Sequence, residues 1–128
     1  MLRLRVWTVG LLAATTAMSS SGSGQSAAKV VHVVAERFSF TPSDITVDEG
    51  TVMELRITSD DTTHGFKLVG PKGTSDINVE VPKRGRGEAK VTFEASEPGT
   101  YIFECSHVCG AGHGFMRGTI RVKGRSTS

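Results

Sequence analysis

Soft metal-binding side chains are concentrated in one short segment near the C-terminus. Cys105, Cys109, His113 and Met116 follow one another with the spacing C-x3-C-x3-H-x2-M, and both cysteines of the chain lie here. Thiolates, an imidazole and a thioether form a ligand set that binds copper in preference to hard cations. Between its first and last donors the segment has no Asp, Glu, Lys or Arg, so it offers few hard oxygen donors. The pattern predicts a site for a soft or borderline metal ion.

The same segment is rich in glycine and needs one more strong donor from elsewhere in the chain. Gly110, Gly112 and Gly114 allow the backbone to curl so that several side chains converge on one point. His64 lies in a turn that follows a predicted strand ending near Thr58. Because a β-sandwich can bring such a turn beside a later loop, His64 is the candidate for the additional donor.

Four kinds of site are compatible with these donors. A disulfide between Cys105 and Cys109 would be ordinary in an exported chain, but it leaves the histidines and Met116 without a role. Tetrahedral zinc could use both cysteines, His113 and His64, but has no use for the thioether. A mononuclear blue copper centre needs one cysteine, so Cys109 would serve and Cys105 would be spare. A binuclear copper centre uses every donor and is the favoured interpretation.

The elements that would position these donors are short β-strands. Apolar and polar side chains alternate as in half-buried strands within residues 31–35, 53–57, 89–95 and 120–122. Phe38 and Phe40 extend the first segment up to Pro42, and Tyr101 to Glu104 runs directly into Cys105. No helical period is sustained, and turn signals recur about every ten residues. The pattern predicts an all-β domain, a sandwich or barrel.

The first 28 residues have the composition of a secretory signal peptide. Positive charge in Met1–Arg5 precedes an apolar run, Val6–Met18, and small residues at Ser26–Ala28 suit a cleavage point. As a helix the apolar run would span only about 20 Å, whereas the hydrocarbon core of a membrane is about 30 Å thick. We therefore expect residues 1–28 to be a cleaved signal rather than a short uncleaved anchor. Export would place the protein in the periplasm or on the outer face of the inner membrane.

The remaining chain has the length of one small domain. We expect this domain to occupy residues 29–124 and a flexible tail to occupy 125–128. From Lys29 onward the chain has thirteen basic and thirteen acidic residues, so this part carries no net charge. A neutral domain has no basic field that would attract nucleic acid. Its one basic cluster, residues 83–86, is expected to be a solvated hairpin tip.

Together these segments resemble the copper-A (CuA) domain of cytochrome c oxidase subunit II, in particular the short subunits of the ba3 type. Besides the metal-ligand segment, the resemblance rests on stretches across the domain, which are residues 38–50, 57–59, 64–66, 76–81, 98–101 and 118–122. The strand motifs are shared more widely among cupredoxins. The copper-A domain of nitrous oxide reductase carries a similar loop, so the loop alone does not select a terminal enzyme.

The resemblance implies a Greek-key cupredoxin sandwich that holds two copper ions. In this arrangement the thiolates of Cys105 and Cys109 would bridge the two ions. His64 and His113 would each bind one ion.

Two weaker ligands are also implied by the resemblance. Met116 would be a weak ligand to one copper ion, and the backbone carbonyl of His107 would be a weak ligand to the other. The side chain of His107 is then expected to face solvent, since the C-x3-H-x2-M spacing favours His113 as the second imidazole ligand.

The function implied by the resemblance is one-electron transfer outside the inner membrane. The expected donor is a redox protein such as a cytochrome c or a cupredoxin, and the expected acceptor is a terminal oxidase with its haem-copper subunit I. The sequence shows no general base or nucleophile pair, so no catalysis by the chain alone is expected. The alternatives are a free-standing periplasmic shuttle, a copper carrier and a nitrous oxide reductase-like domain. Membrane contact is expected only through a partner or a short N-terminal anchor.

Overall fold

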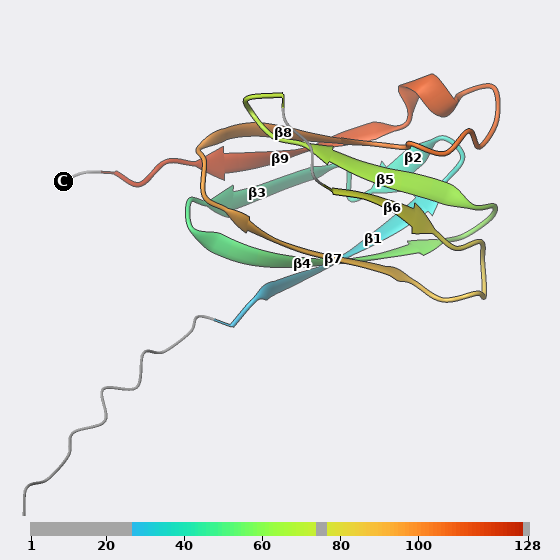
Figure 1. Ribbon diagram of the computed structural model, residues 1–128, viewed down its shortest axis with the longest axis horizontal. Helices are drawn as coiled ribbons and strands as arrows, with labels where there is room; N and C mark the ends of the chain where they lie inside the picture. The colour runs from blue at the N-terminus through green and yellow to red at the C-terminus, as the bar shows by residue number, and fades with distance from the viewer. Residues whose placement is uncertain (1–26, 74–76, 127–128) are drawn as a thin grey trace, which may run out of the picture.

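The regular secondary structure of the described residues is β-strand, apart from one short 3-10 turn. A computed structural model describes residues 27–73 and 77–126, and Figure 1 shows their arrangement. In chain order the elements are β1 (Lys29–Glu36), β2 (Ser39–Thr41), β3 (Asp44–Asp48), β4 (Thr51–Ser59), β5 (His64–Val69), β6 (Ile77–Val81), β7 (Ala89–Ala95), β8 (Gly99–Glu104), the 3-10 turn η1 (His113–Phe115) and β9 (Arg117–Lys123). The predicted all-β fold is confirmed. Most of the predicted signal peptide and the end of the predicted tail lie outside the described residues.

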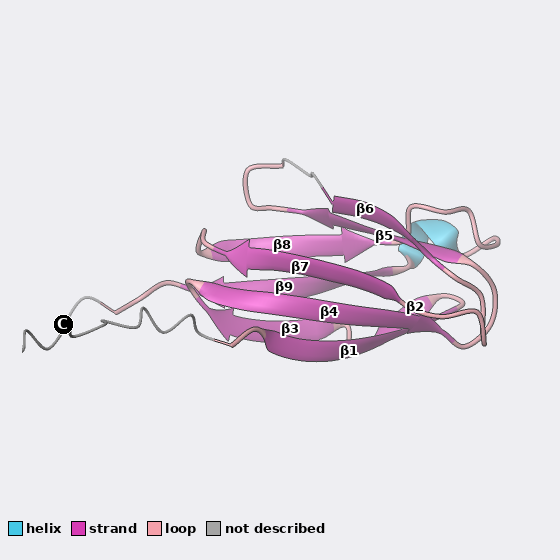
Figure 2. Cartoon of the chain, turned by 60° about the horizontal axis from the view of Figure 1, so that its bottom comes forward, coloured by secondary structure: helices cyan, strands magenta, loops and turns pink. Residues whose placement is uncertain are grey.

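The strands form two sheets that pack face to face, as Figure 2 shows. One sheet has the order β2-β1-β4-β7 and the other has the order β3-β9-β8-β5-β6. β1 pairs with β4, and β3 with β9, in parallel. Because these partners are not consecutive in sequence, the chain crosses between the sheets and its loops gather at the two ends of the sandwich. Within residues 27–73 and 77–126 no helix has the length and apolar character that crossing a membrane requires.

Phe40, Phe66 and Phe103 form an aromatic cluster between the sheets. The ring centroid of Phe40 lies 5.9 Å from that of Phe66 and 5.3 Å from that of Phe103, and the other two rings stack at 5.3 Å. All three side chains are buried. Residues two apart on an extended chain face the same side. His64 therefore faces the interior with Phe66, and Cys105 faces it with Phe103. The core thereby sets the direction of two predicted metal donors.

Residues 31–40 form a hairpin rather than the single strand that their alternation predicts. β1 ends at Glu36, and β2 returns antiparallel with Phe40 opposite Ala35. Phe38 lies in the intervening turn, and its ring packs over glycines of the loop between β8 and β9. Phe38 therefore does not occupy the predicted strand position, and a contact with this loop outside the core holds it instead.

The basic cluster at residues 83–86 is exposed, as the sequence predicts, but it is not a hairpin tip. Its turn joins β6 of one sheet to β7 of the other. The turn does not form a hairpin because β7 pairs antiparallel with β4 in the other sheet and not with β6. The turn therefore sits at an end of the sandwich, together with other connections between the sheets (Figure 1).

The substitution Phe103→Ala should destabilise the domain strongly. It removes a ring from the aromatic cluster beneath Cys105, and Phe-to-Ala changes in protein cores cost about 3–5 kcal/mol. Urea unfolding followed by circular dichroism would measure the loss. Ile102→Ala is the matched control, because its side chain is 40% exposed on the opposite face of the same strand, and it should cost less than about 1 kcal/mol. Equal losses in the two variants would contradict the assignment of Phe103 to the core.

Candidate metal centre

The donor-rich segment is a loop whose two ends are joined by strand pairing. We call residues 105–116 the ligand loop; it connects β8 to β9, which are antiparallel with Glu104 opposite Arg117. The backbone N–H of Cys105 donates a hydrogen bond of 3.0 Å to the carbonyl oxygen of Met116. This bond extends the strand pairing by one step into the loop. The first and last donors of the loop are therefore held opposite each other.

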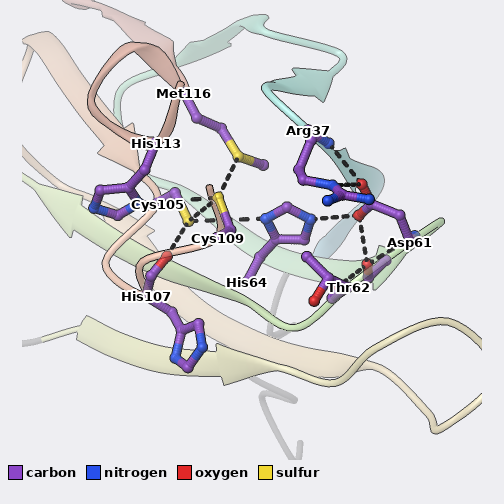
Figure 3. Close-up of polar contacts among 10 residues, drawn as sticks. Arg37, Asp61, Thr62, His64, Cys105, His107, Cys109, His113 and Met116 are labelled. Atoms are coloured by element: carbon purple, nitrogen blue, oxygen red, sulfur yellow. Dashed lines mark hydrogen bonds and ion pairs between the residues drawn. The ribbon is translucent and has the colours of Figure 1, made fainter. Parts of the chain in front are cut away.

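The two cysteines lie side by side as free, buried thiols. Their Sγ atoms are 3.6 Å apart, and Figure 3 shows both pointing into the space enclosed by the loop and β5. The Sγ atoms of both cysteines and a ring nitrogen of His64 all lie within 4.8 Å of one another. Three strong donors are thus grouped closely enough to bind metal.

Cys105 has one imidazole and one backbone oxygen beside it. Its Sγ lies 3.9 Å from Nδ1 of His64 and 3.0 Å from the carbonyl oxygen of His107. The side chain of His107 is exposed and points away from the thiols (Figure 3). The structure therefore places the backbone carbonyl of His107, and not its side chain, beside the Cys105 thiol.

Cys109 has a second imidazole and the thioether beside it. Its Sγ lies 3.9 Å from Nδ1 of His113 and 3.9 Å from Sδ of Met116. Met116 is buried, whereas His113 is partly exposed at the start of η1. Each thiol is therefore paired with one imidazole nitrogen and one weaker donor, so all six residues singled out in the sequence meet at one place.

His64 is oriented by a carboxylate that sequence reasoning did not assign. Its Nε2 lies 2.6 Å from Oδ1 of Asp61. Because an ionised carboxylate only accepts hydrogen bonds, Nε2–H is the donor, and the lone pair of Nδ1 faces the thiols. Metal-binding histidines commonly donate their second ring N–H to a carboxylate or carbonyl group. That rule, applied to the acidic residue three positions before His64, could have identified Asp61 from the sequence.

Asp61 also joins the His64 turn to the end of β1. Its Oδ2 accepts hydrogen bonds from the backbone N–H of Arg37 at 3.0 Å and from Nε of Arg37 at 2.9 Å. Burial acts to raise the pKa of Asp61, but the hydrogen bonds from His64 and Arg37 outweigh it and hold the pKa well below its usual range. The carboxylate is therefore charged at neutral pH and remains an acceptor for His64.

Close backbone contacts hold the ligand loop against its neighbours. A Cβ atom on Gly65 would lie 2.2 Å from Oγ of Ser106 and 2.6 Å from the backbone nitrogen of His107, so only glycine fits where the loop crosses β5. On the other side, Cβ atoms on Gly110 or Gly112 would lie 2.9 or 2.4 Å from the ring of Phe38. The loop is thus packed between β5 and the turn that follows β1.

Burial also affects the protonation of the metal-free thiols. It raises the pKa of Cys109 to about 11, with the neighbouring Cys105 thiol adding to the effect. Without metal this thiol is therefore protonated at neutral pH. Since thiolate is the form that binds metal, metal binding must release the proton.

The two-sheet fold and its cysteine, histidine and methionine donors define the class of this protein. The chain belongs to the cupredoxin-like domain family, which matches residues 8–122. It is 40% identical over 93 residues to cytochrome c oxidase subunit 2 from Thermus thermophilus. That match covers 73% of this chain and 64% of the relative, so the chain spans less than two thirds of the relative's length.

Solved structures give the same picture. A haem-copper terminal oxidase dimer, determined by cryo-EM, matches with a TM-score of 0.59 and 26% identity over 84% of this chain and 78% of that chain. The periplasmic domain of subunit II of cytochrome oxidase from Bradyrhizobium japonicum shares the fold, with a TM-score of 0.62 and 21% identity over 77% of this chain and 86% of that chain. These similarities confirm the resemblance to subunit II, and they imply that the metal is copper.

The substitution Asp61→Ala should lower copper affinity about 10- to 100-fold, because loss of such a hydrogen-bond partner leaves a histidine ligand unoriented. Affinity can be measured by competition with a chelator, followed by absorbance. Asp61→Asn keeps an oxygen acceptor for His64 and should lose less. Asp60→Ala removes the exposed neighbouring carboxylate and should leave the affinity unchanged. If Asp60→Ala and Asp61→Ala lose affinity equally, the effect is one of surface charge and not of orientation.

The substitution Gly65→Ala should displace the ligand loop from β5 and weaken copper binding by roughly tenfold or more, because a displacement of about 1 Å is enough to disable a binding site. Gly114→Ala is a matched control within the loop, since a Cβ there would meet no atom within 4 Å. The same chelator competition would compare the two variants. Unchanged affinity in Gly65→Ala would contradict the tight crossing of loop and strand.

Proposed function

We propose that this domain carries a binuclear copper centre of the copper-A type and transfers single electrons. The observation that supports this proposal most strongly is that the donors fall into two groups, one beside each thiol. Cys105 has His64 and the His107 carbonyl beside it, whereas Cys109 has His113 and Met116. Six donors in two sets of three exceed what one four-coordinate ion uses, and they suit two ions that share both thiolates.

The donor chemistry fits copper better than the competing metals. A structural zinc site takes four donors from cysteine, histidine and carboxylate, so it would leave the thioether of Met116 without a role. A mononuclear blue copper site uses one cysteine, although both thiols face the same space here. Bound copper would supply a redox couple whose two states differ by one electron.

The chain itself would keep the ligand geometry constant during electron transfer. His64 and Met116 are almost completely buried, so water has little access to these donors. The hydrogen bond from His64 to Asp61 and the pairing of Cys105 with Met116 fix both sides of the site. A fixed set of ligands reduces the rearrangement that accompanies a change of charge, and this reduction is what an electron-transfer site requires.

The proposed place of the domain is in a terminal oxidase, on the outer side of the inner membrane. The support is its similarity to cytochrome c oxidase subunit 2 and to the periplasmic domain of subunit II. In that setting a redox protein, such as a cytochrome c or a cupredoxin, would deliver single electrons, and a haem-copper subunit would accept them. A soluble copper carrier is the competing role. It should release copper to a partner, whereas an electron-transfer domain should retain its copper through repeated oxidation and reduction.

Copper loading tests the proposed centre directly. The full chain should bind two copper ions, become purple, and give an electron paramagnetic resonance spectrum in which one unpaired electron couples equally to two copper nuclei. Metal analysis and spectroscopy on the same sample measure both properties. One ion per chain with a four-line spectrum would contradict the binuclear centre and favour blue copper.

The substitution Cys105→Ser should abolish the purple spectrum, because one of the two bridging thiolates is lost. Ala111→Ser changes an exposed residue in the same loop and should leave the spectrum as it is. Absorption and electron paramagnetic resonance spectra of the two copper-loaded variants give the comparison. A wild-type spectrum from Cys105→Ser would show that a single cysteine is sufficient.

A further inference from the structure

An exposed arginine contacts the carboxylate that orients a buried metal donor. Arg37 lies in the turn between β1 and β2, and its side chain is 51% exposed. Its Nε donates a hydrogen bond of 2.9 Å to Oδ2 of Asp61, whose Oδ1 lies 2.6 Å from Nε2 of the fully buried His64. Figure 3 shows these three side chains in a row. A single carboxylate therefore connects a cation at the surface to a donor of the proposed copper centre.

The position of Asp61 is also fixed by bonds that do not depend on the side chain of Arg37. The backbone N–H of Arg37 donates a hydrogen bond of 3.0 Å to Oδ2 of Asp61. On the other side, the buried hydroxyl of Ser59 accepts a hydrogen bond of 3.2 Å from the backbone N–H of Asp61 and donates one to the carbonyl oxygen of Thr62. A change of side chain at position 37 therefore removes the guanidinium contact and leaves this frame in place.

The aliphatic part of Arg37 packs on the ligand loop. A Cβ atom on Gly110 would lie 3.7 Å from Cδ of Arg37, which is an ordinary packing distance. Gly110 directly follows Cys109 in the loop. Long cationic side chains commonly cover other groups with their stems while the charged head stays near water. Arg37 thus touches the loop on the Cys109 side and the carboxylate on the His64 side, so one side chain is in contact with the supports of both halves of the donor set.

Arg37 and His64 share the charge of one carboxylate. A carboxylate that accepts a hydrogen bond from the second ring N–H of a histidine makes the other ring nitrogen a more basic metal ligand. A guanidinium on the same carboxylate forms a charge-assisted hydrogen bond and draws negative charge away from the imidazole. The side chain of Asp61 is only 19% exposed, so water and salt screen these contacts only in part. The guanidinium of Arg37 therefore limits the basicity that Asp61 gives to His64.

We propose that Arg37 is a positioning residue that acts through Asp61 on His64. It confines the carboxylate against Nε2–H of the imidazole and limits the negative charge that the imidazole receives. The effect on copper rests on the proposed function, whereas the effect on the hydrogen bond does not. Because the oxidised centre carries one more positive charge than the reduced centre, a more basic His64 favours the oxidised state. Loss of the guanidinium should therefore lower the reduction potential.

Nuclear magnetic resonance of the metal-free, reduced full chain tests the hydrogen bond without copper. Arg37→Gln should speed the exchange of the His64 Nε2–H proton with solvent roughly tenfold, the order expected when one hydrogen bond to a charged group is lost. Arg86→Gln is the matched control. It removes an exposed cation from the turn in which the backbone N–H of Arg84 donates to the carbonyl oxygen of Asp61, and it should leave the exchange unchanged. Unchanged exchange in Arg37→Gln, or an equal change in both variants, would overturn the proposal.

The reduction potential of the copper-loaded full chain supplies the second measurement. Redox titration should give a lower potential for Arg37→Gln than for the unchanged chain, and Arg86→Gln should stay close to the unchanged chain. A change that merely loosened the fold would not predict this direction. A higher potential in Arg37→Gln, or an equal fall in Arg86→Gln, would contradict an action through the carboxylate.

A double-mutant cycle shows whether the effect of Arg37 passes through Asp61. Residues that act through one hydrogen-bond network have non-additive effects. In the background of Asp61→Asn, which has no carboxylate charge to share, Arg37→Gln should lower the potential much less than it does in the unchanged chain. An undiminished fall would show that Arg37 acts by its charge alone and would overturn the proposal. A chain that binds no redox-active copper would refute the proposed function, whereas the exchange of the Nε2–H proton would still decide the role of Arg37.

Discussion

The antiparallel pairing of β8 with β9 is the constraint on which the metal site depends. Five of the six donors lie in the connection between these strands, and the hydrogen bond from Cys105 to Met116 closes its base. Without that closure a loop with several glycines would have no single conformation. Phe103, one residue before the end of β8, anchors the pairing in the aromatic cluster. The site is thus an extension of the core rather than an attachment to it.

The sixth donor reaches the loop from the neighbouring strand. β5 pairs with β8, with Leu68 opposite Phe103, so His64 at the start of β5 lies beside the beginning of the loop. Asp61 then connects this histidine to Arg37, and Phe38 covers two loop glycines. One short turn after β1 therefore supports both parts of the ligand set, through a carboxylate on one side and a ring on the other.

The sequence was sufficient to predict the parts of the site that depend on local spacing. Four of the five donors in the loop share one motif, and the alternation before Cys105 indicated the strand that leads into it. The contact of Asp61 with Arg37 and the packing of Phe38 on the loop were not predicted, because they join segments that are distant in the chain. The contact of Asp61 with His64 spans only three residues and was within reach of sequence reasoning. Alternation with a period of two shows which face of a strand is buried, but it does not identify the neighbouring strand. For the same reason the parallel pairing of β1 with β4 and the position of the basic cluster at residues 83–86 required the structure.

The two halves of the donor set are supported unequally, and this has a consequence for how metal is exchanged. His64 and Cys105 adjoin strands and inward-facing phenylalanines, whereas His113 lies in a three-residue 3-10 turn and is partly exposed. Local opening of a protein begins where few buried contacts must be broken. A fluctuation confined to η1 would detach the His113 imidazole while the core stayed folded. We therefore expect metal to enter and leave through the face that carries η1, with the strand-supported half as the last point of attachment.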